Sequence, residues 1–296
     1  MDERLFALVA ARLASAPVVV ASVLDTEGAV PRRRGARMLV WRDGSEASVG
    51  GGLAESRVVE AARALLGNPS APRELRIELR GGREDAGVCG GAMRIALRRW
   101  DGAGDAARVA AIAGALARGE TVALTASDLG SADDGDTARP DERLVIVGAG
   151  HCSVALHELA RPLEFDTWVY DDRADCFGDG RFAGASVLSG NARRLREALW
   201  TSRETCVVLL NRDFRQDVTA LRTIAEATKA SGRAPKYLGM MGSRRRIAEV
   251  RNALGKAAPV LDAIEAPLGI EIGAETPHEI AVSILARLIA VRRSAG

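Results

Sequence analysis

Four cysteines are the side chains in this sequence best suited to act as nucleophiles or as soft metal ligands. Cys89 precedes two glycines, where a thiol is accessible to a ligand, whereas Cys206 lies in the apolar run 205–210 and is predicted to be inert packing. Cys152 is expected in the first turn of a helix, where the helix dipole lowers a thiol pKa; a small buried residue is an equally good interpretation. The cysteine spacing predicts no zinc site.

The three histidines are candidate proton carriers. We expect His151 at the glycine-rich corner described below, His157 further along the same helix at a packing edge, and His278 in the exposed first turn of the last helix. No Tyr-x-x-x-Lys pair accompanies them. The histidines therefore provide no convincing proton donor for an oxidoreductase.

Residues 144–172 have the layout of a dinucleotide-binding unit: strand, glycine turn, helix, strand, acid. Gly148 permits the tight turn, and Gly150 lets the backbone approach a phosphate, which the amide groups of the following helix can bind. Asp171 follows the second strand, where it can accept a hydrogen bond from a ribose hydroxyl. Ser153 replaces the usual third glycine. The residues predicted to bind a cofactor here are Gly148, Gly150, His151, Cys152, Asp171, Asp172 and Arg173.

Two further stretches in the first half of the chain could bind anions. Residues 27–35 include Arg32 and Arg33 in a run of three arginines, whose guanidinium groups could clamp a phosphate or form a solvated turn. The triplet Gly50–Gly52 lies between a strand and a helix that contains Glu55, and it could bind an anion or serve as a plain tight turn. We expect Arg32, Arg33, Gly50, Gly51, Gly52 and Glu55 to contribute to cofactor binding.

A third basic stretch, residues 242–246, follows the predicted strand 236–240. Ser243 is a natural N-cap, and the arginines that follow it oppose the helix dipole, which is understandable if an anion binds there. The alternative is that these arginines point into water or pair with acids. The residues predicted to bind a cofactor are Gly242, Ser243, Arg244 and Arg245, on the same sheet rim as the glycine turn.

Composition and patterning predict an α/β protein with two domains. A mixed α/β domain is expected over residues 1–127, a linker poor in large apolar residues over 128–142, and a Rossmann-type doubly wound parallel-sheet domain over 143–296. The net charge of +2 gives no case for nucleic-acid binding, and no apolar run is long enough to cross a membrane. The first residues read as an amphipathic helix and not as a signal peptide, so we expect a cytoplasmic protein with reduced thiols.

These motifs together resemble those of the XdhC/CoxI family of molybdenum-hydroxylase maturation proteins. The matching stretches, in the family's order, are residues 27–40, 49–55, 88–91, 147–151 with 171–173, 237–246 and 267–292. The resemblance implies binding of the molybdenum cofactor (molybdopterin), help in its sulfuration by a cysteine desulfurase, and delivery to xanthine dehydrogenase or a related hydroxylase. In that role Cys89 would face the molybdenum or its sulfur.

The sequence departs from the family pattern at two places. Leu53 stands after the glycine triplet where family members often have Cys or His, and Arg212 and Phe214 replace histidines of the segment 211–217. These departures leave room for an NAD(P)-dependent oxidoreductase or a non-catalytic nucleotide sensor on the same domain. A homodimer is one option for its assembly.

Overall fold

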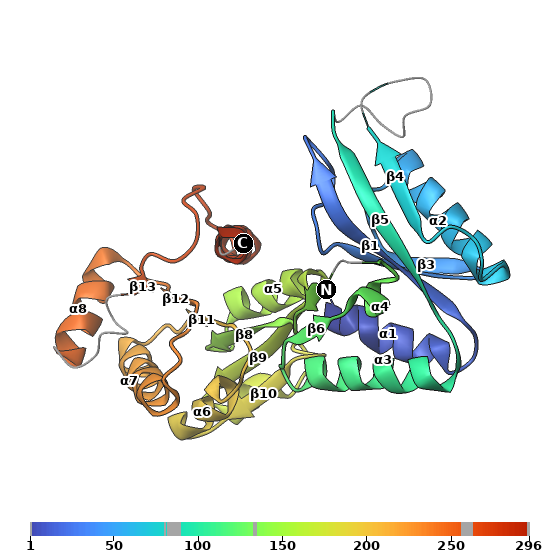
Figure 1. The fold of residues 1–296 in the computed structure, drawn as a ribbon. Coiled ribbons are helices and arrows are strands. Elements are labelled where there is room, and N and C mark those ends of the chain that lie inside the picture. Colours follow the sequence, from blue (N-terminus) through green and yellow to red (C-terminus); the bar gives the residue numbers. More distant parts are fainter. Residues whose placement is uncertain (1, 80, 82–89, 133–134, 256–262, 295–296) are drawn as a thin grey trace. The chain divides into compact units, whose positions relative to one another are not determined.

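The computed structural model describes residues 2–79, 81, 90–132, 135–255 and 263–294 (Figure 1). The chain divides into two compact units, Met1–Pro140 (unit 1) and Asp141–Gly296 (unit 2). Within these described ranges, no helix has the length and apolar character needed to cross a membrane.

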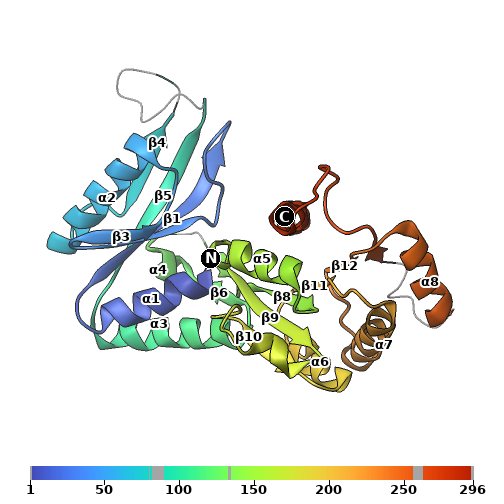
Figure 2. The same cartoon turned by 180° about the vertical axis from the view of Figure 1, so that it is seen from behind.

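Unit 1 is built on an antiparallel sheet of five strands in the order β3-β2-β1-β5-β4. The central strand β1 is buried on both faces, because alternate side chains such as Val19 and Val20 enter two separate cores. Helix α2 covers one face of the sheet, and α1 and α3 cover the other (Figures 1 and 2). The bounds are α1 Asp2–Leu13, β1 Val18–Glu27, β2 Arg37–Trp41, β3 Gly44–Ala47, α2 Gly52–Gly67, β4 Glu74–Glu78, β5 Ala92–Trp100 and α3 Gly102–Ala117.

Most of the segment expected as a linker is ordered structure of unit 1. Helix α4 (Ala126–Leu129) begins with a capping box in which Thr125 and Asp128 bond each other's backbone, and Arg108 pairs with Asp128. Strand β7 (Asp136–Ala138) pairs antiparallel with β6 (Val122–Leu124). The sequence prediction rested on the scarcity of large apolar residues, but these polar contacts hold the segment in place together with the buried Leu129 and Ala138.

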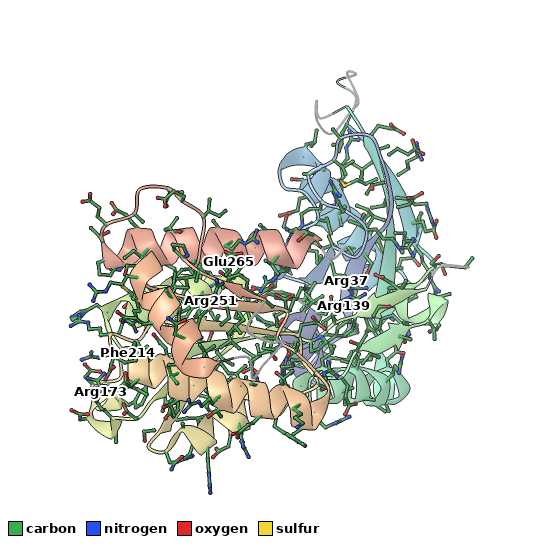
Figure 3. The ribbon with its side chains drawn as sticks, turned by 90° about the vertical axis from the view of Figure 1, so that its left-hand side faces the viewer. Arg37, Arg139, Arg173, Phe214, Arg251 and Glu265 are labelled. Carbon is green, nitrogen blue, oxygen red and sulfur yellow. The ribbon has the colours of Figure 1, made fainter. Side chains whose placement is uncertain are left out.

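Asp136 of β7 also pairs with Arg37, whose side chain is buried and which bonds Asp2 at 2.6 Å. The backbone amide of Arg139 donates to the other oxygen of Asp2 at 2.9 Å (Figure 3 labels Arg37 and Arg139). These ionic contacts tie the N-terminal helix, β2 and β7 together, so the boundary of unit 1 falls at Pro140.

Unit 2 is a doubly wound parallel sheet, as predicted. Six strands lie in the order β10-β9-β8-β11-β12-β13, and all neighbouring pairs are parallel. Helices α5 and α9 pack on one face, and α6, α7 and α8 pack on the other (Figure 2). The strand bounds are β8 Glu142–Val147, β9 Phe165–Asp171, β10 Ser186–Ser189, β11 Thr205–Leu209, β12 Tyr237–Met240 and β13 Ile264–Glu265. The helix bounds are α5 His151–Ala160, α6 Leu195–Leu199, α7 Phe214–Ser231, α8 Arg244–Leu254 and α9 Pro277–Ser294.

The chain order reverses direction in the sheet between β8 and β11, because β9 and β10 lie on one side of β8 and the later strands on the other. Ligands of open α/β sheets bind at the carboxyl ends of the strands at such a switch point. The glycine turn after β8 and the segment after β11 therefore form the rim where a ligand site is expected.

Candidate functional site

The turn after β8 needs a glycine at its first position. Gly148 has φ +102°, and its amide donates to the carbonyl of Tyr170 at 2.7 Å. A Cβ on Gly148 would lie 2.8 Å from Oδ1 of Asn211, which follows β11. The two edges of the switch point thus approach too closely for any side chain at this glycine.

Gly150 has a different role, because its backbone is ordinary and its surroundings are open. Its φ is −80°, and a Cβ built on it meets nothing within 4 Å. Gly150 is the N-cap of α5, with no side chain bonded to the helix end. The first amide groups of a helix have no acceptor within it, and here the next residues are exposed His151 and half-buried Cys152. This helix end offers donors and a positive dipole end to an anion.

The thiol of Cys152 lies beside this helix end, and its surroundings favour the second of the two interpretations, a small partly buried residue. Burial raises the pKa of Cys152, and the nearby guanidinium of Arg212 offsets this only in part. The pKa of Cys152 therefore lies above its ordinary value, which disfavours the thiolate. Arg212, which replaces a family histidine, brings a positive charge to the switch point from the β11 side.

Asp171 does not present a free carboxylate to a ribose. Its side chain is 3% exposed, and Oδ2 accepts from the amide of Ala149 at 2.8 Å. Arg173 donates to it from its backbone at 3.0 Å and from Nε at 2.9 Å. Burial raises the pKa of Asp171, but the bonds from Arg173 and Ala149 outweigh it, so the pKa lies below its ordinary value. The predicted ribose acceptor is instead a brace between β9 and the glycine turn.

Asp172 is the acid that remains accessible. Its side chain is 50% exposed and accepts from Nε2 of Gln216 at 3.0 Å. It lines a cavity of about 410 Å³ at the carboxyl ends of β8 to β11. Figure 3 labels Arg173, which follows Asp172, and Phe214, two residues before Gln216, at this end of unit 2.

The basic stretch after β12 is mainly structural. Ser243 caps α8, as predicted, by accepting from the amide of Arg246 at 3.3 Å. Arg245 is exposed and pairs with Glu249 at 3.1 Å. Arg246 pairs with the buried Asp217 and donates at 2.8 Å to the carbonyl oxygens that follow β11. Thus two of the three arginines pair with acids, the alternative left open by the sequence.

Asp217 and Asn211 were missed by sequence reasoning as parts of the site. Burial raises the pKa of Asp217, although Asn211 and Arg246 lower it. Asn211 Nδ2 donates to Asp217 at 2.9 Å, which fixes the Asn211 side chain against Gly148. The spacing Asn-x5-Asp after an apolar strand was the available signal. These buried polar groups position the β11 edge of the switch point.

The glycine triplet of unit 1 is closed by an acid of its own helix. Glu55 accepts from the amide of Gly51 at 3.1 Å and from the hydroxyl of Ser48. The positive φ of Gly51 and Gly52, +73° and +58°, explains the glycines as turn residues. A carboxylate thus already lies at the amino end of α2, which favours the tight-turn alternative for Gly50–Gly52 over an anion site.

Three of the sequence motifs nevertheless meet at one end of the unit 1 sheet. A Cβ on Gly91 would lie 2.3 Å from the carbonyl of Glu27, and one on Gly28 would lie 2.9 Å from the carbonyl of Gly90. A Cβ on Gly50 would lie 2.9 Å from Pro31. The connections after β1 and before β5 are therefore packed backbone to backbone, and the connection before α2 packs on the Pro31 side chain. Cys89 itself lies outside the described residues.

The arginine run in the first of these connections is not a free clamp. Arg34 donates to the carbonyl oxygens of Leu24 and Gly135, each at 2.8 Å, and so holds the loop. Arg33 is exposed, and Arg32 is half-buried and has an interaction partner. Arg34 therefore stabilises the loop, while the exposed Arg33 remains available to a ligand.

The other two histidines and Cys206 lie away from the glycine turn's helix end. His157 is buried, with Nε2 3.1 Å from the carbonyl of Ala183, and exposed His278 lies 3.6 Å from Glu158. Burial raises the pKa of Cys206 to about 12, in agreement with inert packing in β11. Across the described ranges, no group of three or more His, Cys, Asp or Glu side chains could hold a metal ion.

Comparison with known proteins places this architecture in a family. The model of the XdhC Rossmann domain matches residues 144–288, and that of the XdhC and CoxI family matches residues 11–77. The chain therefore belongs to the XdhC/CoxI family, as the sequence motifs predicted.

Individual relatives agree with this assignment. The uncharacterized protein YqeB of Escherichia coli is 29% identical over 94% of this chain and 44% of its own length. A probable subunit of the xanthine dehydrogenase of Bacillus subtilis is 30% identical over 52% of this chain and 44% of its own length. The chain spans less than half the length of these relatives. A Bacillus halodurans xanthine dehydrogenase structure has the same fold, with a TM-score of 0.83 at 22% identity over 100% of this chain and 96% of that one.

Proposed function

We propose that this protein is an accessory factor of a xanthine dehydrogenase-type molybdenum hydroxylase, and that unit 2 binds the phosphate of the molybdenum cofactor. The observation that carries the proposal is the uncapped amino end of α5 at the switch point, with open space at Gly150. Membership of the XdhC/CoxI family supports the accessory role. So do the relatives from two Bacillus species, which are themselves described as xanthine dehydrogenase or as part of one.

The residues at this corner fit the phosphate end of molybdopterin. Backbone amides supply donors without a side chain in the way, and Arg212 supplies a positive charge beside Cys152. The nearest acid described above, Asp171, is paired with Arg173, so its charge is compensated. When bound, the molybdenum centre supplies the redox chemistry of the client enzyme, while this chain holds and orients the cofactor.

The same proposal extends to partners. A protein that holds the cofactor for sulfuration must meet a cysteine desulfurase and then the client hydroxylase. Cys89 remains the sequence candidate for contact with molybdenum or its sulfur. Cys152, a half-buried thiol with a raised pKa, would act as a neighbour of the phosphate and not as a sulfur carrier. Assembly as a homodimer stays a proposal.

Mass spectrometry of ligands released from anaerobically purified protein tests the cofactor directly. We expect molybdopterin or one of its nucleotide forms. Titration with a molybdopterin preparation should then show at least roughly tenfold weaker binding by Gly150→Val, about 1.4 kcal/mol. Wild-type affinity in this variant would remove the corner from the site.

A matched control comes from unit 1. Gly104, in the first turn of α3, also meets nothing within 4 Å and lacks a positive φ. Gly104→Val therefore makes the same chemical change at a helix start without altering the site, and it should bind like the wild type. If both variants lose binding equally, the loss reflects stability and not the ligand corner.

The alternative function, an NAD(P)-dependent oxidoreductase, is favoured by one observation, the cavity beside Asp172 at the ends of β9 and β10. Release of NAD(H) or NADP(H) in the same mass-spectrometric experiment, with no pterin, would decide in its favour. A preparation that releases a nucleotide and no redox-active group would support the sensor hypothesis.

A further inference from the structure

Helix α9, seen lengthwise in Figure 3, has an apolar outer face. Its inner face packs in the core of unit 2 through Ile284 and Leu288. On the opposite side Val282 and Ile289 are 50% and 37% exposed, and the half-buried Ala286 lies between them, about one helical turn from each. A surface helix normally carries polar or charged side chains on its outer face, and a helix that is apolar all round is normally buried. The outer face of α9 therefore has the character of an interface.

The segment before α9 widens this apolar surface. Ile270 lies against the helix, because its amide donates to the carbonyl of Ser283 at 3.2 Å and its carbonyl accepts from the Ser283 hydroxyl at 2.6 Å. Ile270 and Ile272 are 41% and 52% exposed. Scattered exposed apolar residues are ordinary, but an apolar patch of this kind marks an interaction surface. We call Ile270, Ile272, Val282, Ala286 and Ile289 the α9 patch.

The outer face of α9 also has the spacing of a coiled-coil seam. Residues 279, 282, 286, 289 and 293 are separated alternately by three and four positions, like the a and d positions of a heptad. The three inner members are Val282, Ala286 and Ile289, and the two end members are Glu279 and Arg293. A second helix can follow a stripe with this spacing along its length. The surface is therefore best matched by another α-helix.

The stripe begins with negative charge. Glu279 is exposed, and its carboxylate accepts at 2.9 and 2.8 Å from the backbone amides of residues 275 and 276, which lowers its pKa. Glu271 is exposed on the segment before the helix, and exposed His278 lies 3.6 Å from Glu158. The amino end of the stripe is therefore acidic at neutral pH.

The stripe ends with positive charge. Arg293 is exposed in the last turn of α9. Arg292, its neighbour, pairs with Glu142 at 2.8 Å, and Arg287 pairs with Glu265 at 2.7 Å, so these two cations are compensated within unit 2. Arg293 is thus the cation that the stripe offers to a partner. An apolar stripe with one acidic end and one basic end is complementary to its own copy turned end to end.

We propose that the α9 patch is the contact between two copies of this chain, whose α9 helices pair antiparallel about a two-fold axis at Ala286. Glu279 of each copy then faces Arg293 of the other, and Val282 packs beside Ile289 of the other. The small Ala286 lets the helices approach closely at the axis. A two-fold interface uses the same surface on both copies, as this self-complementary stripe requires. A parallel pair would place like charges together at both ends. The inference does not depend on the cofactor site.

Sedimentation velocity of the full chain over a range of concentrations tests the contact. The wild type should form a dimer. Val282→Lys should raise the dimer dissociation constant at least tenfold, because the contact would bury a charge. Val187→Lys is the matched control, since Val187 is a 45% exposed valine on the edge strand β10 of the same unit and outside the α9 patch. It should dimerise like the wild type.

Charge reversal tests the antiparallel arrangement. Arg293→Glu places two acids opposite each other and should weaken the dimer several-fold. Adding Glu279→Arg restores opposite charges at both ends, so the double variant should dimerise more tightly than either single variant. A parallel pair would show no such recovery. Melting temperatures check that loss of the Glu279 cap does not unfold the chain.

A wild type that stays monomeric at every concentration would overturn the inference, and the α9 patch would then serve unit 1 or another protein. A dimer that is unchanged by Val282→Lys, or weakened equally by Val187→Lys, would also overturn it. Absence of recovery in the charge-reversed double variant would refute the antiparallel pairing.

Discussion

The two glycine-rich helix starts of this protein look alike in sequence and differ in structure. At α2, Glu55 lies four residues after the N-cap Gly51 and bonds its amide. At α5, the residue four after the N-cap Gly150 is Val154, a partly buried apolar side chain that packs in the core. The first helix end therefore has an internal anion, and the second is open to an external one. A glycine turn before a helix therefore indicates an anion site only where no acidic side chain of that helix bonds the amides of the turn.

The largest loss of stability is expected from the polar network beside the open corner, the glycine turn 148–150 at the amino end of α5. Asp217→Ala leaves Arg246 without its buried partner and Asn211 without the acceptor that fixes it against Gly148. Breaking a buried ion pair costs about 3–5 kcal/mol. Chemical denaturation should show a loss of this size in the free energy of unfolding.

Asp213→Ala is the control for this change. Asp213 is exposed, and its side chain accepts a capping bond from the amide of Arg215, so removing this side chain should cost about 1 kcal/mol. If the Asp217 variant is no less stable than the Asp213 variant, the network does not hold the switch point.

The next effect separates the two glycines of the open corner. Gly148→Ala combines φ +102° with a Cβ 2.8 Å from Asn211, so we expect a loss of about 1–3 kcal/mol. Gly150→Ala has neither problem and should change stability by less than about 0.5 kcal/mol. Thermal unfolding of both variants measures the difference, and equal losses would contradict the distinction between a packed glycine and an open one.

A smaller effect is expected from opening the closed corner. Glu55→Ala removes the acceptor of the Gly51 amide and should cost about 1 kcal/mol. The double variant Glu55→Ala with Gly150→Val has a blocked site at α5 and an opened one at α2. Added phosphate should therefore raise its melting temperature more than that of the Gly150→Val single variant. Glu55→Gln, which keeps an oxygen acceptor, should lose less stability. Unchanged stability in the alanine variant would show that Glu55 does not cap α2.

The smallest effect concerns the arginines after β12. The Arg245 side chain is 89% exposed and its pair with Glu249 lies on the surface. Arg245→Ala should therefore change stability by less than about 0.5 kcal/mol and leave phosphate affinity unchanged. A severalfold loss of affinity, measured by titration at two salt concentrations, would return this arginine to the ligand site.

The sequence predicted the parallel sheet well. Strands such as 144–147 and 205–209 are covered on both faces, so each reads as a continuous apolar run that can be recognised on its own. It also predicted the cap at Ser243, whose side chain accepts from the amide three positions further on. Local patterns of this kind are complete within a few residues.

The errors concern side chains whose partners lie far along the chain. Asp171 has the right spacing for a ribose, but Arg173 and the glycine turn use its oxygens. Arg246 belongs to the arginine run that could bind an anion, but its partner Asp217 lies 29 positions earlier in the chain. The segment 128–140 has few large apolar residues, yet Asp136 holds it through Arg37, and Leu129 and Ala138 are buried in the core. Charge alone cannot show whether a polar side chain is already paired within the fold.

Nuclear magnetic resonance of ¹⁵N-labelled protein titrated with pyrophosphate tests the central claim most directly, because it reads both helix starts in one experiment. The open-corner account predicts saturable shifts of the amides of Gly150, His151 and Cys152, with no comparable shift at Gly51 and Gly52. Shifts at Gly51 and Gly52 without shifts at Gly150 and His151 would contradict it.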